Sequence, residues 1–269
     1  MKKIFINLLC FFIPSKKLRH KIRYNCFNNN KNFKKNNQNE NILLKHAILS
    51  AHHHPKVFSE YKNKFNGRDV VLVATGPSLA KFKPINNAIY VGVNRAFQWG
   101  GHKLDFLFMQ DYCGLDYIED AKDNPAKKFY GIVRHDAFYR NGRSPMIPES
   151  IAIRHGAQRF YVNTSHDNNF SKDLDFAYDI SVQTLSSYGS VVFSAMQFIL
   201  YCNPSRIYLV GCDTSNSGYF NGGKNNMGLD RVMQGWLKMK EFIRIFYPEI
   251  EVISVNPVGL RGLFQDIDQ

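Results

Sequence analysis

The sequence lacks the cysteine spacings of a disulfide framework or a zinc site. Its five cysteines, an odd number, form no CxxC pair and no Cys/His pattern. Cys202 and Cys212 lie within apolar stretches, so we predict buried free thiols in a reducing compartment. The run His52-His53-His54 does not supply a metal site either, because consecutive residues on a helix point in different directions. The sequence therefore predicts no metal ligands.

The sequence also lacks an apolar run long enough to cross a membrane. The run Ile4–Pro14 has eleven residues, whereas a spanning helix needs about 20. Five basic residues between positions 16 and 23 follow it, where a signal peptide would have a small-residue cleavage site. We predict that residues 1–26 anchor the chain on an anionic membrane surface. The alternative is an ordinary first helix docked on the domain.

Charge is nearly balanced after residue 70. Residues 1–70 hold 15 lysines and arginines against three acids, a net charge of +12 out of +13 for the chain. A fold that reads a nucleic-acid backbone would not confine its charge to one end, so no nucleic-acid partner is predicted. Residues 27–41, rich in Asn and Lys, are typical of a linker, and 42–67 predict a helical extension.

Residues 68–269 have the pattern of one α/β domain. Near-continuous apolar runs are typical of strands buried on both faces, and helices between them favour right-handed parallel crossovers. We predict a Rossmann-like, mostly parallel sheet with helices on both faces, and interpret 134–187 as a loop-rich insertion or lid. The predicted strands are 69–75, 88–93, 105–110, 128–133, 159–163, 206–212 and 250–255, and the predicted helices are 78–83, 94–100, 114–122, 189–202 and 229–246.

Small residues follow the first predicted strand as Gly76-Pro77-Ser78. The glycine can take dihedrals that other residues avoid and lets a ligand approach the backbone. The proline suits the first position of a helix, where free N–H groups favour phosphate. Neither GxxxxGK[ST] nor GxGxxG occurs, which argues against Walker ATPases and Rossmann NAD enzymes. The alternative for Gly76-Pro77-Ser78 is a tight βα turn without a ligand.

Polar residues also follow two neighbouring strands. Asn94 offers an amide to a base or a ribose, or caps a helix. Asp111 could hold a ribose, act as a base or cap the next helix. Because the carboxyl ends of parallel strands meet at one edge of a sheet, we expect these positions to share a pocket.

Two later segments belong to the same predicted edge. Gly189-Ser190 opens a long helix, whose first amides attract anions. Asp213 closes the following strand, and Ser215 and Tyr219 in the loop beyond it can donate to a leaving phosphate. These positions together predict a nucleotide-binding enzyme.

The ordered set of these motifs resembles the family 42 bacterial sialyltransferases and the related Maf-type flagellin glycosyltransferases, over roughly residues 68–264. The matching residues are Gly76-Pro77-Ser78-Leu79, Asn94, Gly189-Ser190, Ile207-Tyr208-Leu209-Val210-Gly211-Cys212-Asp213 and Asn256-Pro257. The resemblance implies a GT-A-variant fold and a CMP-activated nonulosonic acid donor, used without an obligatory metal. It implies that Gly76, Ser78 and Asn94 surround the nucleotide, that Ser190 and Asp213 lie near the cytidine or ribose, and that Tyr219 steadies the leaving phosphate.

The general base differs from the one that the resemblance implies. The sialyltransferases carry a histidine after the aspartate segment, and no histidine follows His166 in this chain. At the position of the first phosphate-binding tyrosine of the sialyltransferases, this chain has Ser215. Asp111, which agrees with the Maf-type pattern, and His166 are the first candidates for the base. The remaining candidates are His135, His155 and Asp230.

The sequence thus predicts a cytoplasmic glycosyltransferase, peripheral on the inner face of the inner membrane. It would act on a glycan or glycolipid acceptor of the bacterial surface, such as lipooligosaccharide or capsule. The sequence is compatible with a homo-oligomer and does not decide the oligomeric state. One alternative is a magnesium-dependent enzyme similar to the pterin pyrophosphokinases, with Asp111 and Asp213 as metal ligands. Another is a non-enzymatic protein that binds membrane or nucleic acid through the basic tail.

Overall fold

The computed structural model describes residues 56–110, 117–133, 147–164, 176–223 and 229–269. The predicted membrane segment 1–26, the linker 27–41 and most of the extension 42–67 lie outside the described residues. The strands are β1 (Asp69–Val73), β2 (Ile89–Val93), β3 (Phe106–Met109), β4 (Lys127–Val133), β5 (Gln158–Thr164), β6 (Leu185–Ser187), β7 (Arg206–Val210), β8 (Glu251–Val255) and β9 (Gln265–Ile267). The helices are α3 (Glu149–Arg154), α4 (Val192–Tyr201) and α5 (Leu229–Phe246), with 3-10 helices η1 (Ser59–Tyr61), η2 (Pro77–Lys81), η3 (Asn94–Gln98) and η4 (Glu119–Asp123).

The nine described strands form one parallel sheet in the order β6-β5-β4-β3-β2-β1-β7-β8-β9. From β1 the chain adds five strands in one direction, then returns to place β7 on the other side of β1. Val73 of β1 therefore pairs with Gly92 of β2 on one side and with Val210 of β7 on the other. This arrangement confirms the predicted α/β class.

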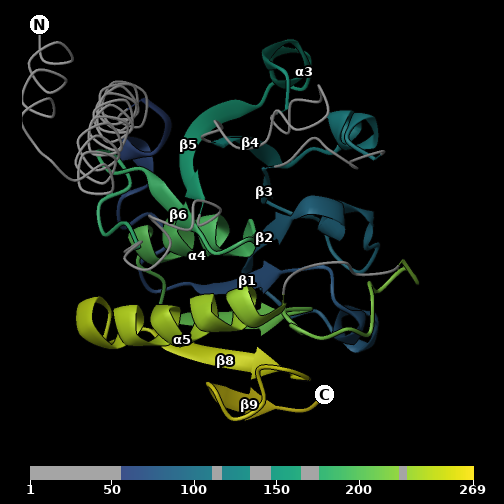
Figure 1. Ribbon diagram of the computed structural model, residues 1–269, viewed down its shortest axis with the longest axis vertical. Coiled ribbons are helices and arrows are strands. Elements are labelled where there is room, and N and C mark those ends of the chain that lie inside the picture. Colours follow the sequence, from purple (N-terminus) through teal and green to yellow (C-terminus); the bar gives the residue numbers. More distant parts are fainter. Residues whose placement is uncertain (1–55, 111–116, 134–146, 165–175, 224–228) are drawn as a thin grey trace, which may run out of the picture. The chain divides into compact units, whose positions relative to one another are not determined.

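Helices cover both faces of the sheet, as predicted. One face is covered by η1, α4 and α5, and all ten residues of α4 are buried there (Figure 1). Phe198 of α4 packs on the rings of Phe108 and Phe129, with centroids 5.2 and 5.5 Å apart. The opposite face carries η2, η3, η4 and α3, around buried residues such as Leu79 and Ile151. Since β1 to β6 and β7 to β9 run outward in opposite directions, this division of helices fits right-handed crossovers on both sides.

Several elements differ from the predicted ones. The crossovers after β1 and β2 are 3-10 helices of five residues rather than α-helices. Pro84 helps to end the first of these, because a proline disfavours helical backbone in the residue before it. The helix predicted at 189 begins at Val192.

Three elements were missed by the sequence analysis: α3, β6 and β9. The strands β6 and β9 have three residues each, which is too short for a periodic signal. α3, β5 and β6 all lie within 134–187, the stretch predicted to be rich in loops, so its described part also contributes regular elements to the fold. Its two strands extend the sheet on one side of β4.

Candidate functional site

The strand order makes the carboxyl ends of β1 and β7 a switch point of the sheet, and we call this edge, with the adjoining end of β2, the strand-end site. β1 and β7 are neighbours, but the chain leaves β1 toward β2 and leaves β7 toward β8. Open α/β sheets bind their ligands at such a point. Gly76-Pro77-Ser78 follows β1, and Gly211-Cys212-Asp213 follows β7.

A hydrogen bond joins the segment after β1 to the segment after β7. The backbone N–H of Ser78 donates to Oδ2 of Asp213 over 2.7 Å, and both residues are buried. The backbone N–H of Gly76 donates to the carbonyl of Gly211 over 2.8 Å. The structure thus brings together Gly76, Ser78 and Asp213, which the sequence placed in one pocket.

Gly76 is required here for space rather than for its dihedral angles. Its φ is −70°, which any residue adopts. A Cβ at Gly76 would overlap Oδ2 of Asp213 and would lie 2.6 Å from the carbonyl oxygen of Gly211. The expectation of an unusual backbone conformation was wrong, and the close approach is made by β7 itself. Pro77 does occupy the first position of η2, as predicted.

The loop after β7 folds back over the end of β1. The backbone N–H of Phe220 donates to the carbonyl of Thr75 over 3.0 Å. The carbonyl of Asp213 accepts the N–H of Gly259 over 2.7 Å. Ser215 and Tyr219, the predicted phosphate donors, belong to this loop and are partly exposed. The loop therefore holds them at the rim of the strand-end site.

Among the described residues, two of the predicted site residues have a buried polar atom without a hydrogen-bond partner. One is Oγ of Ser78, whose residue is 8% exposed, and the other is Oδ1 of Asn94. Asn94 has a φ of 48° and begins η3 without a side-chain cap, so its alternative role as a helix cap is wrong. Buried polar groups are nearly always paired in folded proteins, and an unpaired group of this kind is a candidate contact for a ligand.

A second group of site residues is joined by a directed chain of hydrogen bonds. Oγ of Ser194 in α4 donates to Oε1 of Gln110 over 3.2 Å, and Nε2 of Gln110 donates to Oγ of Ser187 over 3.3 Å. Oγ of Ser187 then donates to the carbonyl of Ser190 over 3.2 Å. Oγ of Ser190 accepts the N–H of Val192 at the start of α4.

Gln110 is the residue that sequence reasoning missed. It follows β3 directly and is 3% exposed, and the carbon chain of its side chain lies against Gly131 of β4. Its hydrogen bonds fix the Gly189-Ser190 turn to the end of β3. A glutamine directly after an apolar strand was the available signal.

The candidates for the general base are only partly described. Asp111, His166 and His135 lie outside the described residues, so their roles stay predictions. His155 is buried beside α3, where its Nδ1 lies 2.8 Å from the hydroxyl of Tyr130 and its Nε2 lies 3.4 Å from Glu119. Its ring is occupied by these structural contacts. Asp230 is exposed in the first turn of α5.

The thiols behave as the sequence predicted. Cys202 and Cys212 are free, the first buried and the second partly buried. Burial raises the pKa of both thiols well above the ordinary value, and for Cys212 the charge of Asp213 raises it further. Among the described residues, no three His, Cys, Asp or Glu side chains gather as a metal-binding group.

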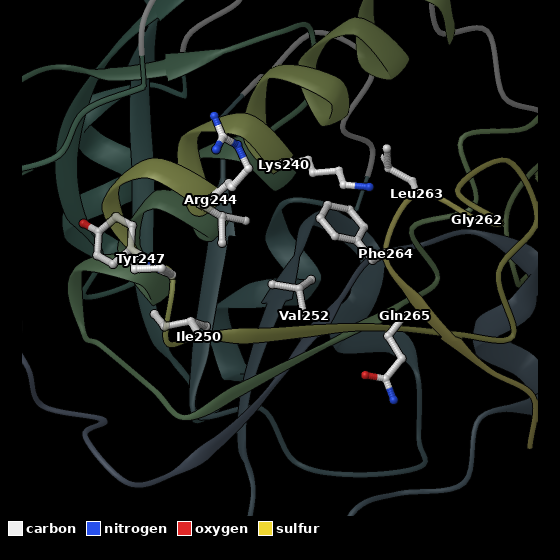
Figure 2. A pocket seen from close by; sticks show the side chains of 11 residues that line it. Lys240, Arg244, Tyr247, Ile250, Val252, Gly262, Leu263, Phe264 and Gln265 are labelled. Atoms are coloured by element: carbon white, nitrogen blue, oxygen red, sulfur yellow. The ribbon is translucent and has the colours of Figure 1, made fainter.

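A separate groove lies between the second half of α5 and the strands β8 and β9, with a volume of about 390 Å³ (Figure 2). Lys240 and Arg244 stand at its rim, and the ring of Phe264 lies on its wall. None of the residues that line this groove was predicted for the site. Its lining residues are Lys240, Ile243, Arg244, Tyr247, Pro248, Ile250, Val252, Gly262, Leu263, Phe264 and Gln265.

Comparisons with known proteins gave one match in structure. No protein-family model matches the chain, and no curated protein sequence matches it significantly. The matching structure is the sialyltransferase CstII from Campylobacter jejuni in complex with a substrate analogue, CMP-3FNeuAc. The identity is 12% and the TM-score is 0.38, over 74% of this chain and 86% of that chain. At this low identity and TM-score the structural similarity does not establish an activity for this chain. The proposed function therefore rests on the residues of the site.

No helix in the described part of the chain is both long and apolar enough to pass through a lipid bilayer.

Proposed function

We propose that this chain is a glycosyltransferase that moves a nonulosonic acid from a CMP-activated donor to a bacterial surface glycan. The observation that carries the proposal is at the strand-end site, where Asp213 accepts the backbone N–H of Ser78 and the buried Oγ of Ser78 has no partner among the described residues. A nucleotide would supply such a partner, because its ribose and phosphate oxygens pair with hydroxyl and amide groups. The choice of cytidine and of the sugar rests on the order of the sequence motifs.

The first group at the strand-end site serves donor binding. Gly76 allows the two strand ends to approach, Ser78 offers a hydroxyl, and Asn94 offers an unpaired carbonyl oxygen. In the proposal this oxygen accepts a hydrogen bond from a ribose hydroxyl or from the amino group of the base.

The chemical step proposed is substitution at the anomeric carbon of the sugar. An acceptor hydroxyl forms the new C–O bond, the bond to the phosphate oxygen breaks, and CMP leaves with the electron pair. Ser215 and Tyr219 at the rim donate hydrogen bonds to the leaving phosphate, which lowers the barrier by stabilising the developing charge. Asp111 or His166 takes the proton of the acceptor hydroxyl. We propose that no divalent metal is obligatory.

The acceptor and the cellular setting are part of the proposal. A glycan linked to lipid lies at the membrane surface, and the basic, apolar-tipped segment 1–26 fits attachment there. The enzyme would then act in the cytoplasm, on the inner face of the inner membrane.

The proposal is tested by nucleotide binding and by transfer. Purified full-length protein is titrated with CMP, UDP and ADP by calorimetry, and we expect CMP to bind most tightly. Incubation with CMP-nonulosonate and a lipooligosaccharide acceptor should then release CMP and add the mass of the sugar to the acceptor. Transfer that persists in EDTA is expected, whereas its loss would contradict the proposal that no divalent metal is obligatory. Transfer of pyrophosphate from ATP in the presence of Mg²⁺, without any sugar transfer, would favour the pyrophosphokinase alternative. Protein that binds no nucleotide would contradict the proposal.

A further inference from the structure

We propose that Arg231 binds the phosphate group of the nucleotide that occupies the strand-end site. This inference deepens the proposed function and rests on it. Arg231 was not among the site residues predicted from the sequence. It lies in the first turn of α5, an 18-residue helix. That turn is at the end of the sheet to which the arrowheads of β1 and β8 point (Figure 1).

The packing of α5 on α4 fixes the direction of Arg231. Arg231 and Gly235 are four residues apart and therefore share one face of the helix. A Cβ at Gly235 would lie 2.5 Å from Cζ of Phe193 and 2.6 Å from Cβ of Tyr188, so this face presses closely on the start of α4. Trp236, 1% exposed, packs on Phe193 with ring centroids 5.1 Å apart.

The side chain of Arg231 lies directly on the Gly189-Ser190 turn. A Cβ at Gly189 would lie 3.1 Å from Cδ of Arg231 and 3.9 Å from its Nη1. The missing side chain of Gly189, whose φ is 79°, leaves room for the arginine stem. The guanidinium is thereby placed beside the turn that leads into α4.

The turn beneath Arg231 is held rigidly. Gln110 bonds to Ser187, and Ser187 bonds to the carbonyl of Ser190, so the turn is tied to the end of β3. The same sheet edge carries the buried and unpartnered Oγ of Ser78, which points to a ligand there independently of the arginine. A guanidinium held at such an edge suits a phosphate, because its planar fork donates two parallel hydrogen bonds to an oxyanion.

The test compares two arginines of the same helix. Arg244 lies 13 residues after Arg231, about 20 Å along the helix axis, and lines the groove between α5 and the strands β8 and β9. Arg231→Gln and Arg244→Gln therefore remove the same charge at the two ends of α5. Each variant is titrated with CMP and with cytidine, which lacks the phosphate.

We expect Arg231→Gln to weaken CMP binding at least about tenfold, because this is the effect on affinity of losing a hydrogen bond between charged groups. Cytidine binding should stay unchanged, because cytidine has no phosphate. Arg231→Lys should fall between wild type and the glutamine variant, because it keeps the charge and loses the fork. Arg244→Gln should match wild type. If Arg231→Gln unfolds, as a melting curve would show, the lysine variant provides the comparison with CMP and cytidine.

The inference is overturned if Arg231→Gln binds CMP as wild type does, if CMP and cytidine weaken equally, or if Arg244→Gln weakens CMP as much. Its failure differs from failure of the proposed function. Wild-type protein that binds UDP or ADP in place of CMP, with the same dependence on Arg231, would refute the donor class and support the inference. Wild-type protein that binds no nucleotide would refute both.

Discussion

The backbone N–H of Ser78 donates to the carboxylate of Asp213 over 2.7 Å, although 135 positions separate the two residues in the chain. The contact joins the loop after β1 to the loop after β7. Each loop alone leaves polar backbone groups exposed at the end of a buried strand. Together they form the strand-end site on which the proposed function rests.

Two replacements of Asp213 distinguish the effect of its hydrogen bond to Ser78 from the effect of its negative charge. Asp213→Ala leaves the buried N–H of Ser78 without an acceptor, so we expect the free energy of unfolding to fall by about 1–3 kcal/mol. Asp213→Asn keeps an acceptor oxygen and should recover most of that loss, while CMP binding stays weaker than in wild type. Urea denaturation and calorimetry measure the two effects. Wild-type stability in Asp213→Ala would show that the contact contributes nothing to the fold.

Replacement of Ser78 should affect binding and spare stability. Oγ of Ser78 has no partner among the described residues, so Ser78→Ala removes no hydrogen bond and should change the free energy of unfolding by less than about 0.5 kcal/mol. CMP affinity should fall about fivefold, the worth of one neutral hydrogen bond. Ser194→Ala is the control, because its Oγ is bonded to Gln110 and its loss should destabilise the fold. A reversed pattern would refute the assignment of Ser78 to the ligand.

Gly76→Ala should impair both the fold and the binding. The added Cβ would meet Asp213 and the carbonyl of Gly211, both at a strand end that cannot shift freely. We expect a loss of at least about 2 kcal/mol in stability, measured by thermal or urea unfolding. Gly100→Ala is the matched control, since a Cβ there meets no atom within 4 Å. Equal effects at the two glycines would contradict the close approach of β1 and β7.

Stability should fall in mild alkali. Burial raises the pKa of Cys202 and of Cys212 above the value of an unfolded thiol, about 8.5. The unfolded chain then releases protons first as the pH rises, so folding stability is full below that value and declines above it. The slope is at most about 1.4 kcal/mol per pH unit for each thiol. Denaturant unfolding in reducing buffer between pH 7 and 10 measures it.

Cys202→Ala is the control for the alkaline decline. It should reduce the slope of stability against pH between about pH 8.5 and 10, because one of the two buried thiols is gone. Its stability at pH 7 should drop modestly through lost packing. An unchanged slope would mean that Cys202 does not contribute to the pH dependence.

The sequence predicted the long elements well and the contacts between distant segments poorly. The helix predicted at 229–246 is α5, because its apolar face repeats at helical spacing over 18 residues. Gly76, Ser78 and Asp213 were placed at one edge because parallel strands end together. Gln110 was missed because its partners Ser187 and Ser194 lie 77 and 84 residues away. No local pattern records such a pairing.

The strand order also bears on synthesis of the chain at the ribosome. One side of β1 pairs with β2 early, but its other side pairs with β7, which begins at Arg206. Until then the nascent polypeptide presents an open, apolar strand edge that can associate with other molecules. Truncations before residue 206 should therefore give insoluble products, and chaperones should engage this region during translation.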